Sequence, residues 1–152
     1  HRGKEMYLDT FADEGVGRLW RAAVHLGLIV ELHIGPEYAA QVRDVLEAIP
    51  ETTVLIDHLA EPHMGDAVEY ASVLDLARYD GVYMKLSGLG HFAHDPPLYA
   101  SASVFTRRVV DAFGPERLVW GSGDPAIVDH HIFLRLILNI WNCWIPPSRR
   151  SR

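Results

Sequence analysis

Four short runs of apolar and β-branched residues, separated by segments with helical periodicity, constrain the fold of this chain most strongly. The runs cover residues 28–34, 53–58, 81–88 and 118–122. Between them, apolar side chains recur every three or four residues, which is typical of helices that bury one face. Strands that alternate with helices are joined by right-handed crossovers and form a parallel sheet. The sequence therefore predicts an α/β protein with four parallel strands.

Turn and capping residues mark the ends of the predicted helices. Gly27 ends the first helix, and Asp66 and Glu69 have the spacing of a capping box at the start of the third. The fourth helix is predicted over residues 98–113. The first and third helices thus each have, at one end, residues that suit a helix end.

The length of the chain leaves two architectures open. A complete (β/α)₈ barrel needs about 250 residues, and this chain has 152. Four strand–helix units fit either a small doubly wound sheet or the second half of a barrel. The first residue is not methionine, so we expect either a processed chain or a piece of a longer one.

Charge and hydropathy exclude some classes of partner. Lys and Arg total 14 against 20 Asp and Glu, which gives a net charge of −6, so no nucleic acid partner is expected. The most apolar run, residues 132–141, falls short of the roughly 20 residues that cross a bilayer. No membrane partner is expected either.

Features of the N-terminus and the cysteine content favour the cytoplasm. Residues 1–5 are polar and lack the apolar segment of a signal peptide. A single cysteine, Cys143, excludes an internal disulfide and a cysteine-rich zinc site. A reducing compartment is therefore the expected location.

Two histidines end successive predicted strands. His33 and His58 follow neighbouring strands, which lie about 4.8 Å apart in a sheet, so both imidazoles could converge on one ion or one substrate. Glu31 or Asp57 could hold a ring in the required tautomer. The alternative interpretation is that each histidine is structural.

Alternation along the strands predicts which side chains share a face. Glu31 is expected to lie on the same face as His33, and Val54 and Ile56 on the same face as His58. Polar residues on otherwise apolar strands are costly to bury. These faces are therefore expected to line a barrel interior near its open mouth.

Four motifs, taken in order, resemble a known family. They are DHL at residues 57–59, KLSG at 85–88, FGPERL at 113–118 and WGS at 120–122. The set is similar to the amidohydrolase-related family of TIM-barrel, mostly metal-dependent hydrolases, which includes sugar-acid and dicarboxylate lactonases, with decarboxylases as relatives. The resemblance implies that the chain is the C-terminal half, strands five to eight, of a (β/α)₈ barrel.

The resemblance also implies a domain division. The barrel domain would cover residues 1–131, and residues 132–152 would form an apolar helix and a basic tail outside it. Those residues are interpreted as a docking helix or as the result of a change of reading frame.

The resemblance further implies a set of site residues. His33 matches a metal ligand, and His58 matches a histidine that contacts the metal or the reacting water and substrate. Asp124 would be both a metal ligand and the general base, although the family pattern has its Asp at the position of Gly123. These residues would hold a single divalent ion, Zn²⁺ or Mn²⁺.

The implied activity is hydrolysis of a lactone or similar ester-like bond in a small organic acid. One alternative is a decarboxylase or lyase of the same family, with or without metal. Another is a non-catalytic half barrel, since the His-x-His pair of the family's first strand does not occur in this sequence. Open sheet edges would then predict self-association.

Two interpretations stay open for two further groups of side chains. Lys85 or Ser87 could contact a substrate carboxylate, with packing in the barrel interior as the alternative. The pairs His91 with His94 and His130 with His131 are interpreted as solvated loop residues. Of these, His91 is the one expected to reach the mouth of the pocket.

Overall fold

Four parallel strands form one sheet in the order in which they occur in the chain. The computed structural model describes residues 10–64, 66–95 and 99–121. The strands are β1 (Ile29–Leu32), β2 (Thr53–Ile56), β3 (Val82–Leu86) and β4 (Leu118–Trp120). Every neighbouring pair is parallel. This arrangement confirms the predicted strand–helix alternation.

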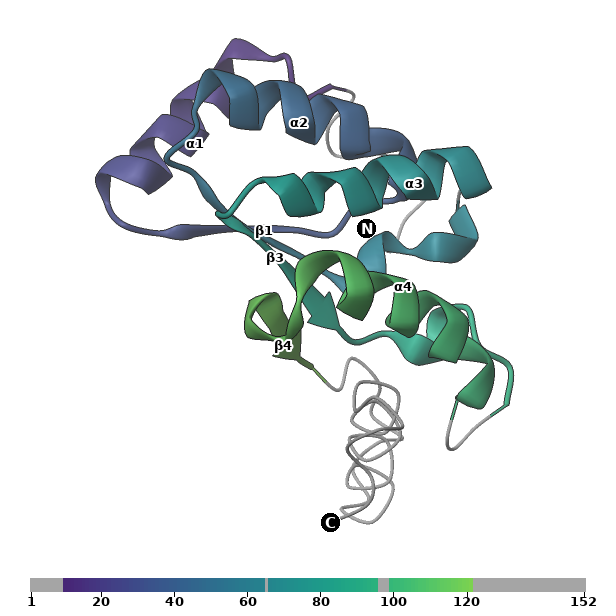
Figure 1. Ribbon diagram of the computed structural model, residues 1–152. Coiled ribbons are helices and arrows are strands. Elements are labelled where there is room, and N and C mark those ends of the chain that lie inside the picture. The colour runs from purple at the N-terminus through teal and green to yellow at the C-terminus, as the bar shows by residue number, and fades with distance from the viewer. Residues whose placement is uncertain (1–9, 65, 96–98, 122–152) are drawn as a thin grey trace.

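One helix precedes the first strand and three others connect the strands, and these helices cover one face of the sheet (Figure 1). They are α1 (Glu14–His25), α2 (Ala39–Ala48), α3 (Ala67–Asp75) and α4 (Ser103–Phe113). The capping box predicted at α3 is present, because Asp66 accepts from the backbone of Glu69 and Glu69 accepts from the backbone of Asp66. Gly27 follows α1 with φ +65, a conformation that favours glycine.

The fourth helix begins later than the sequence predicted. Its predicted first residue, 98, lies outside the described residues, and a short 3₁₀ turn (Ala100–Ala102) precedes α4. The end of α4 at Phe113 agrees with the prediction, since Gly114 and Pro115 follow it. The difference is therefore confined to the N-terminal side.

The core lies between the sheet and the helices. Alternate residues of β2 and β3 point into it and are fully buried, and large side chains from the helices pack against them. Among the largest fully buried side chains are Trp20, Tyr70, Phe113, Ile56 and Met84. Each such side chain contributes roughly 1.5–3 kcal/mol by leaving water.

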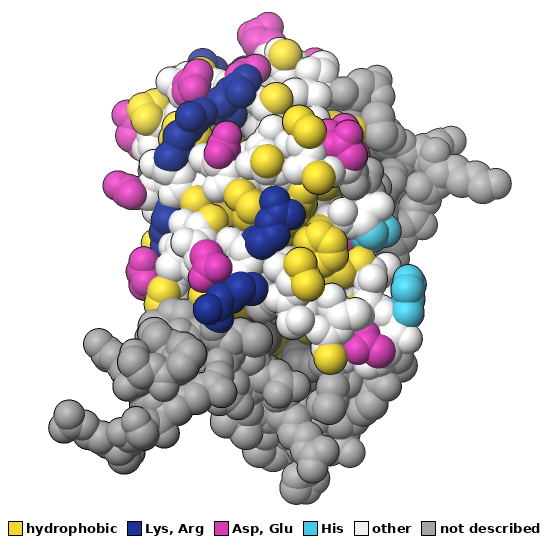
Figure 2. All heavy atoms as spheres, turned by 45° about the vertical axis from the view of Figure 1, so that its right-hand side comes forward, with side chains coloured by type: hydrophobic (Ala, Val, Ile, Leu, Met, Phe, Trp, Pro, Cys, Tyr) yellow, Lys and Arg dark blue, Asp and Glu magenta, His cyan; other side chains and the backbone are white. Residues whose placement is uncertain are grey.

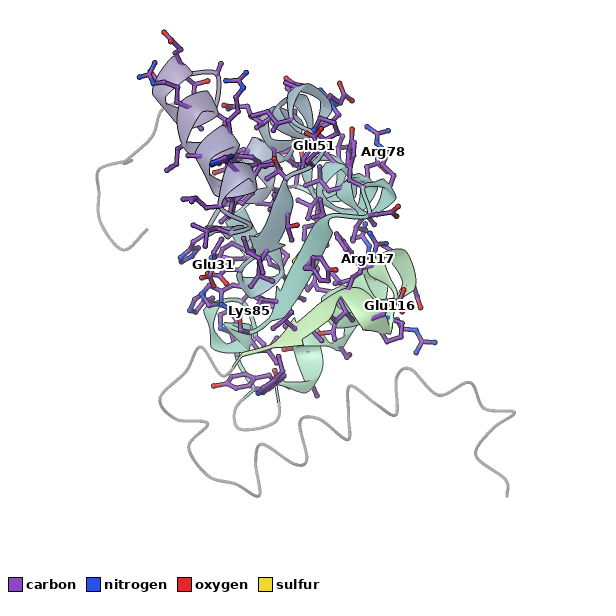
Figure 3. All side chains as sticks on the ribbon, turned by 90° about the vertical axis from the view of Figure 1, so that its left-hand side faces the viewer. Glu31, Glu51, Arg78, Lys85, Glu116 and Arg117 are labelled. Atoms are coloured by element: carbon purple, nitrogen blue, oxygen red, sulfur yellow. The ribbon has the colours of Figure 1, made fainter. Side chains whose placement is uncertain are left out.

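The opposite face of the sheet carries the polar side chains. Figure 3 shows Glu31 and Lys85 on the side of the strands away from Arg78 and Arg117. Ile29 and Val119, which are 60% and 39% exposed, also occur on the strands. In a complete barrel this face would be the interior.

One predicted grouping of side chains is wrong. Val54 and Ile56 do not share the open face but are buried against the helices, where their exposure is 0%. His58 is nevertheless next to residues of the open face, because regular alternation ends where β2 ends at Ile56. The expectation that all three residues line the barrel interior therefore fails.

Several predictions concern residues that the structure does not describe. The division between residues 1–131 and 132–152, and the site residue Asp124, lie outside the described residues. Within residues 10–64, 66–95 and 99–121, no helix has both the length and the apolar character needed to cross a bilayer.

Candidate metal centre

The candidate site lies at the carboxyl ends of the first three strands. His33 comes directly after β1, His58 follows β2, and Ser87 and His91 belong to the loop after β3. Parallel strands bring these ends to one edge of the sheet, where the loops of parallel α/β folds form their sites. The structure thus brings His33 and His58 together as the sequence predicted, with ring centroids 4.8 Å apart.

A left-handed turn connects β2 to the site. Residues 58–61 have φ values of 52, 55, 57 and 47, and none of them is glycine. Each such residue costs roughly 1–2 kcal/mol. Two backbone hydrogen bonds support the turn, from Ala60 to Asp57 at 2.8 Å and from Glu61 to His58 at 2.9 Å. The turn holds the side chain of Glu61 among the histidines.

Glu61 is the central residue of the cluster and is only 3% exposed. Its Oε1 lies 2.9 Å from Nε2 of His33 and 2.8 Å from Nδ1 of His91. Its Oε2 lies 3.5 Å from Nδ1 of His63 and, although buried, has no hydrogen-bond partner. One carboxylate therefore links histidines from three loops.

His58 is held on one side by Ser87. The Oγ of Ser87 lies 2.8 Å from Nδ1 of His58, which leaves Nε2 free of this contact. Burial lowers the pKa of His58 below its ordinary value, and the nearby His91 and His33 act in the same direction. The carboxylates of Asp57 and Glu61 oppose this shift. The neutral imidazole, which is the form that ligates metals, is thus favoured.

The donor set fits a divalent cation. His33, His58 and Glu61 each offer one ligand atom, and these atoms all lie within 4.8 Å of one another. Two imidazoles and a carboxylate form a ligand set known from catalytic zinc sites, which use three protein ligands. The buried and unsatisfied Oε2 of Glu61 is a further donor that a cation would satisfy.

The site is open to solvent on the histidine side. Figure 2 shows histidine side chains that reach the molecular surface. His33, His63 and His91 are each partly exposed, whereas Glu61 is buried behind them. A small molecule could therefore approach the imidazoles while the carboxylate stays away from bulk water.

The predicted role of Glu31 and Asp57 as tautomer-fixing carboxylates is wrong. Both pair with Lys85, whose Nζ lies 2.8 Å from Oδ1 of Asp57 and also contacts Oε1 of Glu31. Hydrogen bonds to Asp57 and then Glu31 raise the pKa of Lys85. Glu61 contacts His33 instead, and Ser87 contacts His58.

Of the remaining residues considered in the sequence, the structure describes His91. His91 reaches the pocket, as expected from its place in the loop, and it is not simply a solvated loop residue, because it contacts Glu61 and packs against His58. Asp124, His130 and His131 lie outside the described residues.

Sequence reasoning missed Glu61. The signal available was the loop DHLAEPH at residues 57–63, where four of seven residues are titratable. So many titratable residues directly after a strand indicate a site, but the sequence does not predict which of these side chains is buried.

Comparison with known proteins decides the family. The profile of the amidohydrolase family matches residues 4–138. The chain belongs to the amidohydrolase family. Its sheet of four parallel strands with helices on one face agrees with half of the TIM barrel that this family builds.

Curated relatives of this amidohydrolase include two lactone hydrolases. It is 35% identical over 79 residues to L-fucono-1,5-lactonase of Burkholderia ambifaria. It is 28% identical over 99 residues to 4-sulfomuconolactone hydrolase of Rhizobium radiobacter. The matches cover 50% and 63% of this chain but 27% and 32% of those proteins. The chain thus matches about a third of the length of these relatives.

A solved structure extends the likeness to the fold. The crystal structure of an amidohydrolase from Burkholderia multivorans with bound zinc has a TM-score of 0.72 and 18% sequence identity to this amidohydrolase. The match covers 91% of this chain and 54% of that one. At this identity the likeness concerns the fold, and the four strands correspond to about half of the larger chain.

Proposed function

We propose that this amidohydrolase chain supplies the site of a metal-dependent hydrolase that opens a lactone or a similar ester-like bond in a small organic acid. The observation that carries the proposal is the group of His33, His58 and Glu61, whose ligand atoms lie within 4.8 Å of one another at the carboxyl edge of the sheet. The lactone hydrolases among its relatives support the substrate class.

The proposed cofactor is a single divalent ion, Zn²⁺ or Mn²⁺. Its proposed ligands are His33, which follows β1, and Asp124. When bound, the ion would polarise the ester carbonyl and lower the pKa of a nearby water toward 7. The imidazole of His33, anchored by the carboxylate of Glu61, supports this assignment.

His58 and Asp124 are the proposed catalytic residues. Water adds to the carbonyl carbon, the ring C–O bond breaks, and the ring oxygen leaves as an alcohol after it takes up a proton. His58 orients the water or polarises the carbonyl, and the contact of Ser87 with its Nδ1 fixes the direction of the ring. Asp124 accepts the proton of the attacking water and returns it to the leaving oxygen.

Lys85 and Ser87 are both engaged inside the protein. Lys85 lies between the carboxylates of Glu31 and Asp57, and Ser87 lies against His58. These contacts favour packing and positioning roles over direct recognition of a substrate carboxylate.

The proposed setting is the cytoplasm, and the proposed partner is a small lactone or organic acid. The open face of the sheet adds a second proposal, self-association, which the exposed Ile29 and Val119 on its strands favour. Sedimentation velocity over a range of concentrations tests it, and a monomer at all concentrations would contradict it.

A lactone panel tests the enzymatic proposal directly. The 152-residue chain is loaded with Zn²⁺ or Mn²⁺ and given sugar-acid and dicarboxylate lactones, and proton release is followed at constant pH. We expect turnover that a chelator abolishes and added metal restores. Release of CO₂ from an organic acid would assign the decarboxylase alternative, and no reaction with any lactone or acid would support a non-catalytic half barrel.

A further inference from the structure

We propose that Glu61 is a direct ligand of the divalent cation, together with His33 and His58, and not merely a hydrogen-bonding partner of the histidines. This rests on the proposed function in one respect, namely that a divalent cation binds at this edge of the sheet. It adds a carboxylate ligand that the family resemblance did not indicate. It also makes the described residues sufficient to supply three protein ligands.

The charge of Glu61 is the first reason. A buried carboxylate is costly unless a positive charge compensates it, and the side chain of Glu61 is only 4% exposed. Its ion-pair partners in the described part of the chain are imidazoles, those of His33, His63 and His91. An imidazole, unlike a divalent cation, carries positive charge only when it is protonated. Lys85 pairs instead with Glu31 and Asp57.

The free oxygen of Glu61 is the second reason. Its Oε2 is buried and has no hydrogen-bond partner, and His63, the ion-pair partner on that side, is 3.5 Å away. Buried polar atoms without partners are rare in proteins and indicate a missing partner such as an ion. Ligation of a cation would satisfy this oxygen.

The backbone is the third reason. Four consecutive residues, 58–61, adopt positive φ, and the strain places both His58 and Glu61 at the site. Strained backbone of this kind concentrates at ligand and catalytic sites, where surrounding interactions sustain it. A purely structural carboxylate would not need both side chains to converge.

Two neighbouring side chains orient the proposed ligands. Ser87 contacts Nδ1 of His58, so Nε2 is the nitrogen left for the cation. His91 contacts Oε1 of Glu61 through Nδ1 and fixes the direction of the carboxylate. Partners of this kind fix the orientation of the residues that ligate a metal.

Cobalt spectroscopy on a cysteine variant distinguishes a ligand from a positioning residue. Glu61→Cys is prepared in the Cys143→Ser background, which removes the single native thiol, and Co²⁺ is titrated into the full chain. A thiolate bound to Co²⁺ produces a sulfur-to-metal charge-transfer absorption in the near ultraviolet. We expect this absorption in Glu61→Cys and not in the Cys143→Ser parent. Co²⁺ binding without the absorption would overturn the proposal.

An isosteric variant provides the second test. Glu61→Gln keeps the shape and removes the charge, and competition with a chromophoric chelator measures its affinity for Zn²⁺. We expect at least a tenfold loss of affinity. The matched control is Glu31→Gln, which changes an exposed carboxylate of the same sheet paired with Lys85, and it should bind Zn²⁺ like the parent. An unchanged affinity in Glu61→Gln, with native circular dichroism, would overturn the proposal.

The two proposals fail in different ways. If the parent binds one equivalent of Co²⁺ through Glu61 but hydrolyses no lactone, the ligand assignment stands and the proposed function fails. If the parent binds neither Co²⁺ nor Zn²⁺, the ligand assignment is overturned, whatever activity is measured.

Discussion

Gly88 lies directly against His58, because a Cβ added to Gly88 would be 2.6 Å from Cγ and Nδ1 of the imidazole. The backbone of Gly88 also has φ +64, which side chains disfavour. This close approach accompanies the 2.8 Å contact between the adjacent Ser87 and His58. The loop after β3 thus depends on a glycine to reach the histidine that follows β2.

Gly88→Ala is expected to displace His58 and to weaken metal binding by at least tenfold. The added Cβ cannot occupy the position of the ring, so the ring or the loop must move. Positive φ adds a stability cost of about 1 kcal/mol. Zn²⁺ affinity and urea unfolding, measured on the same preparation, separate the two effects.

Gly27→Ala is the matched control. Gly27 has φ +65, nearly the same as Gly88, but nothing lies within 4 Å of an added Cβ. The Gly27→Ala variant should be destabilised by the same amount, about 1 kcal/mol, and should keep the Zn²⁺ affinity of the parent. Equal affinity losses in the two variants would show that strain, and not contact with His58, is responsible.

Ser87→Ala is expected to lower Zn²⁺ affinity by about 10–100-fold, the usual effect of removing a group that orients a metal-binding histidine. The fold should survive, because one hydrogen bond contributes only about 1 kcal/mol. Ser72→Ala, which changes an exposed serine on α3, should leave the affinity unchanged. Full affinity in Ser87→Ala would show that the Oγ does not orient His58.

The pH dependence of stability should report on His58 in the metal-free chain. Burial lowers its pKa below the ordinary value of 6.5. As the pH falls through 6.5, the unfolded chain takes up a proton at this residue before the folded chain does, so the free energy of unfolding decreases until the pH passes the folded pKa. Above pH 6.5 the protonation of His58 should not change the free energy of unfolding.

Urea unfolding between pH 4.5 and 8, in chelator, tests this expectation. His58→Gln should reduce the loss of stability at acid pH, whereas His25→Gln, at an exposed position in α1, serves as the control. The imidazole proton shifts of His58 in NMR spectra give its pKa independently. A pKa of His58 above 6.5 in the folded chain would contradict the expected downward shift.

Arg117 is expected to stabilise the fold without a role at the site. Its guanidinium donates to the backbone carbonyls of Phe113, Ala77 and Tyr79 at 2.8–3.0 Å, on the side of the sheet away from Lys85 (Figure 3). Arg117→Ala should cost about 2–3 kcal/mol because it leaves part-buried carbonyls unpaired.

Arg43→Ala is the control for that experiment. Arg43 is partly exposed and pairs with its neighbour Asp44, so its loss should change stability by about 0.5 kcal/mol or less. Both variants should bind Zn²⁺ like the parent. A large loss of affinity in Arg117→Ala would mean that the two faces of the sheet are coupled.

The local sequence pattern predicted the helices and strands well because residues within or next to each element mark where it begins and ends. The four strands occur inside the predicted runs, and the Asp66–Glu69 capping box starts α3 as expected. Gly27 marked the end of α1, since the backbone preference of glycine does not depend on distant residues. The convergence of His33 with His58 followed from the geometry of parallel strands.

The composition of the site was harder to predict because it depends on a turn. Strand alternation predicts His58 on the same face as Val54 and Ile56, but it lies next to residues of the open face. The reason is that the left-handed backbone at residues 58–61 ends the regular strand pattern. That turn also brings in Glu61, which no spacing rule indicates. Lys85, from a third strand, pairs with the two carboxylates expected beside the histidines, and only the assembled sheet reveals this pairing.

Anomalous diffraction at the zinc edge, from crystals of the 152-residue chain soaked in Zn²⁺, tests the metal centre most directly. We expect one strong peak within about 2.0–2.2 Å of a nitrogen of His33, a nitrogen of His58 and a carboxylate oxygen of Glu61. A peak that lacks His33, His58 or Glu61 among its ligands, or crystals with no ordered zinc at this edge of the sheet, would contradict the assignment.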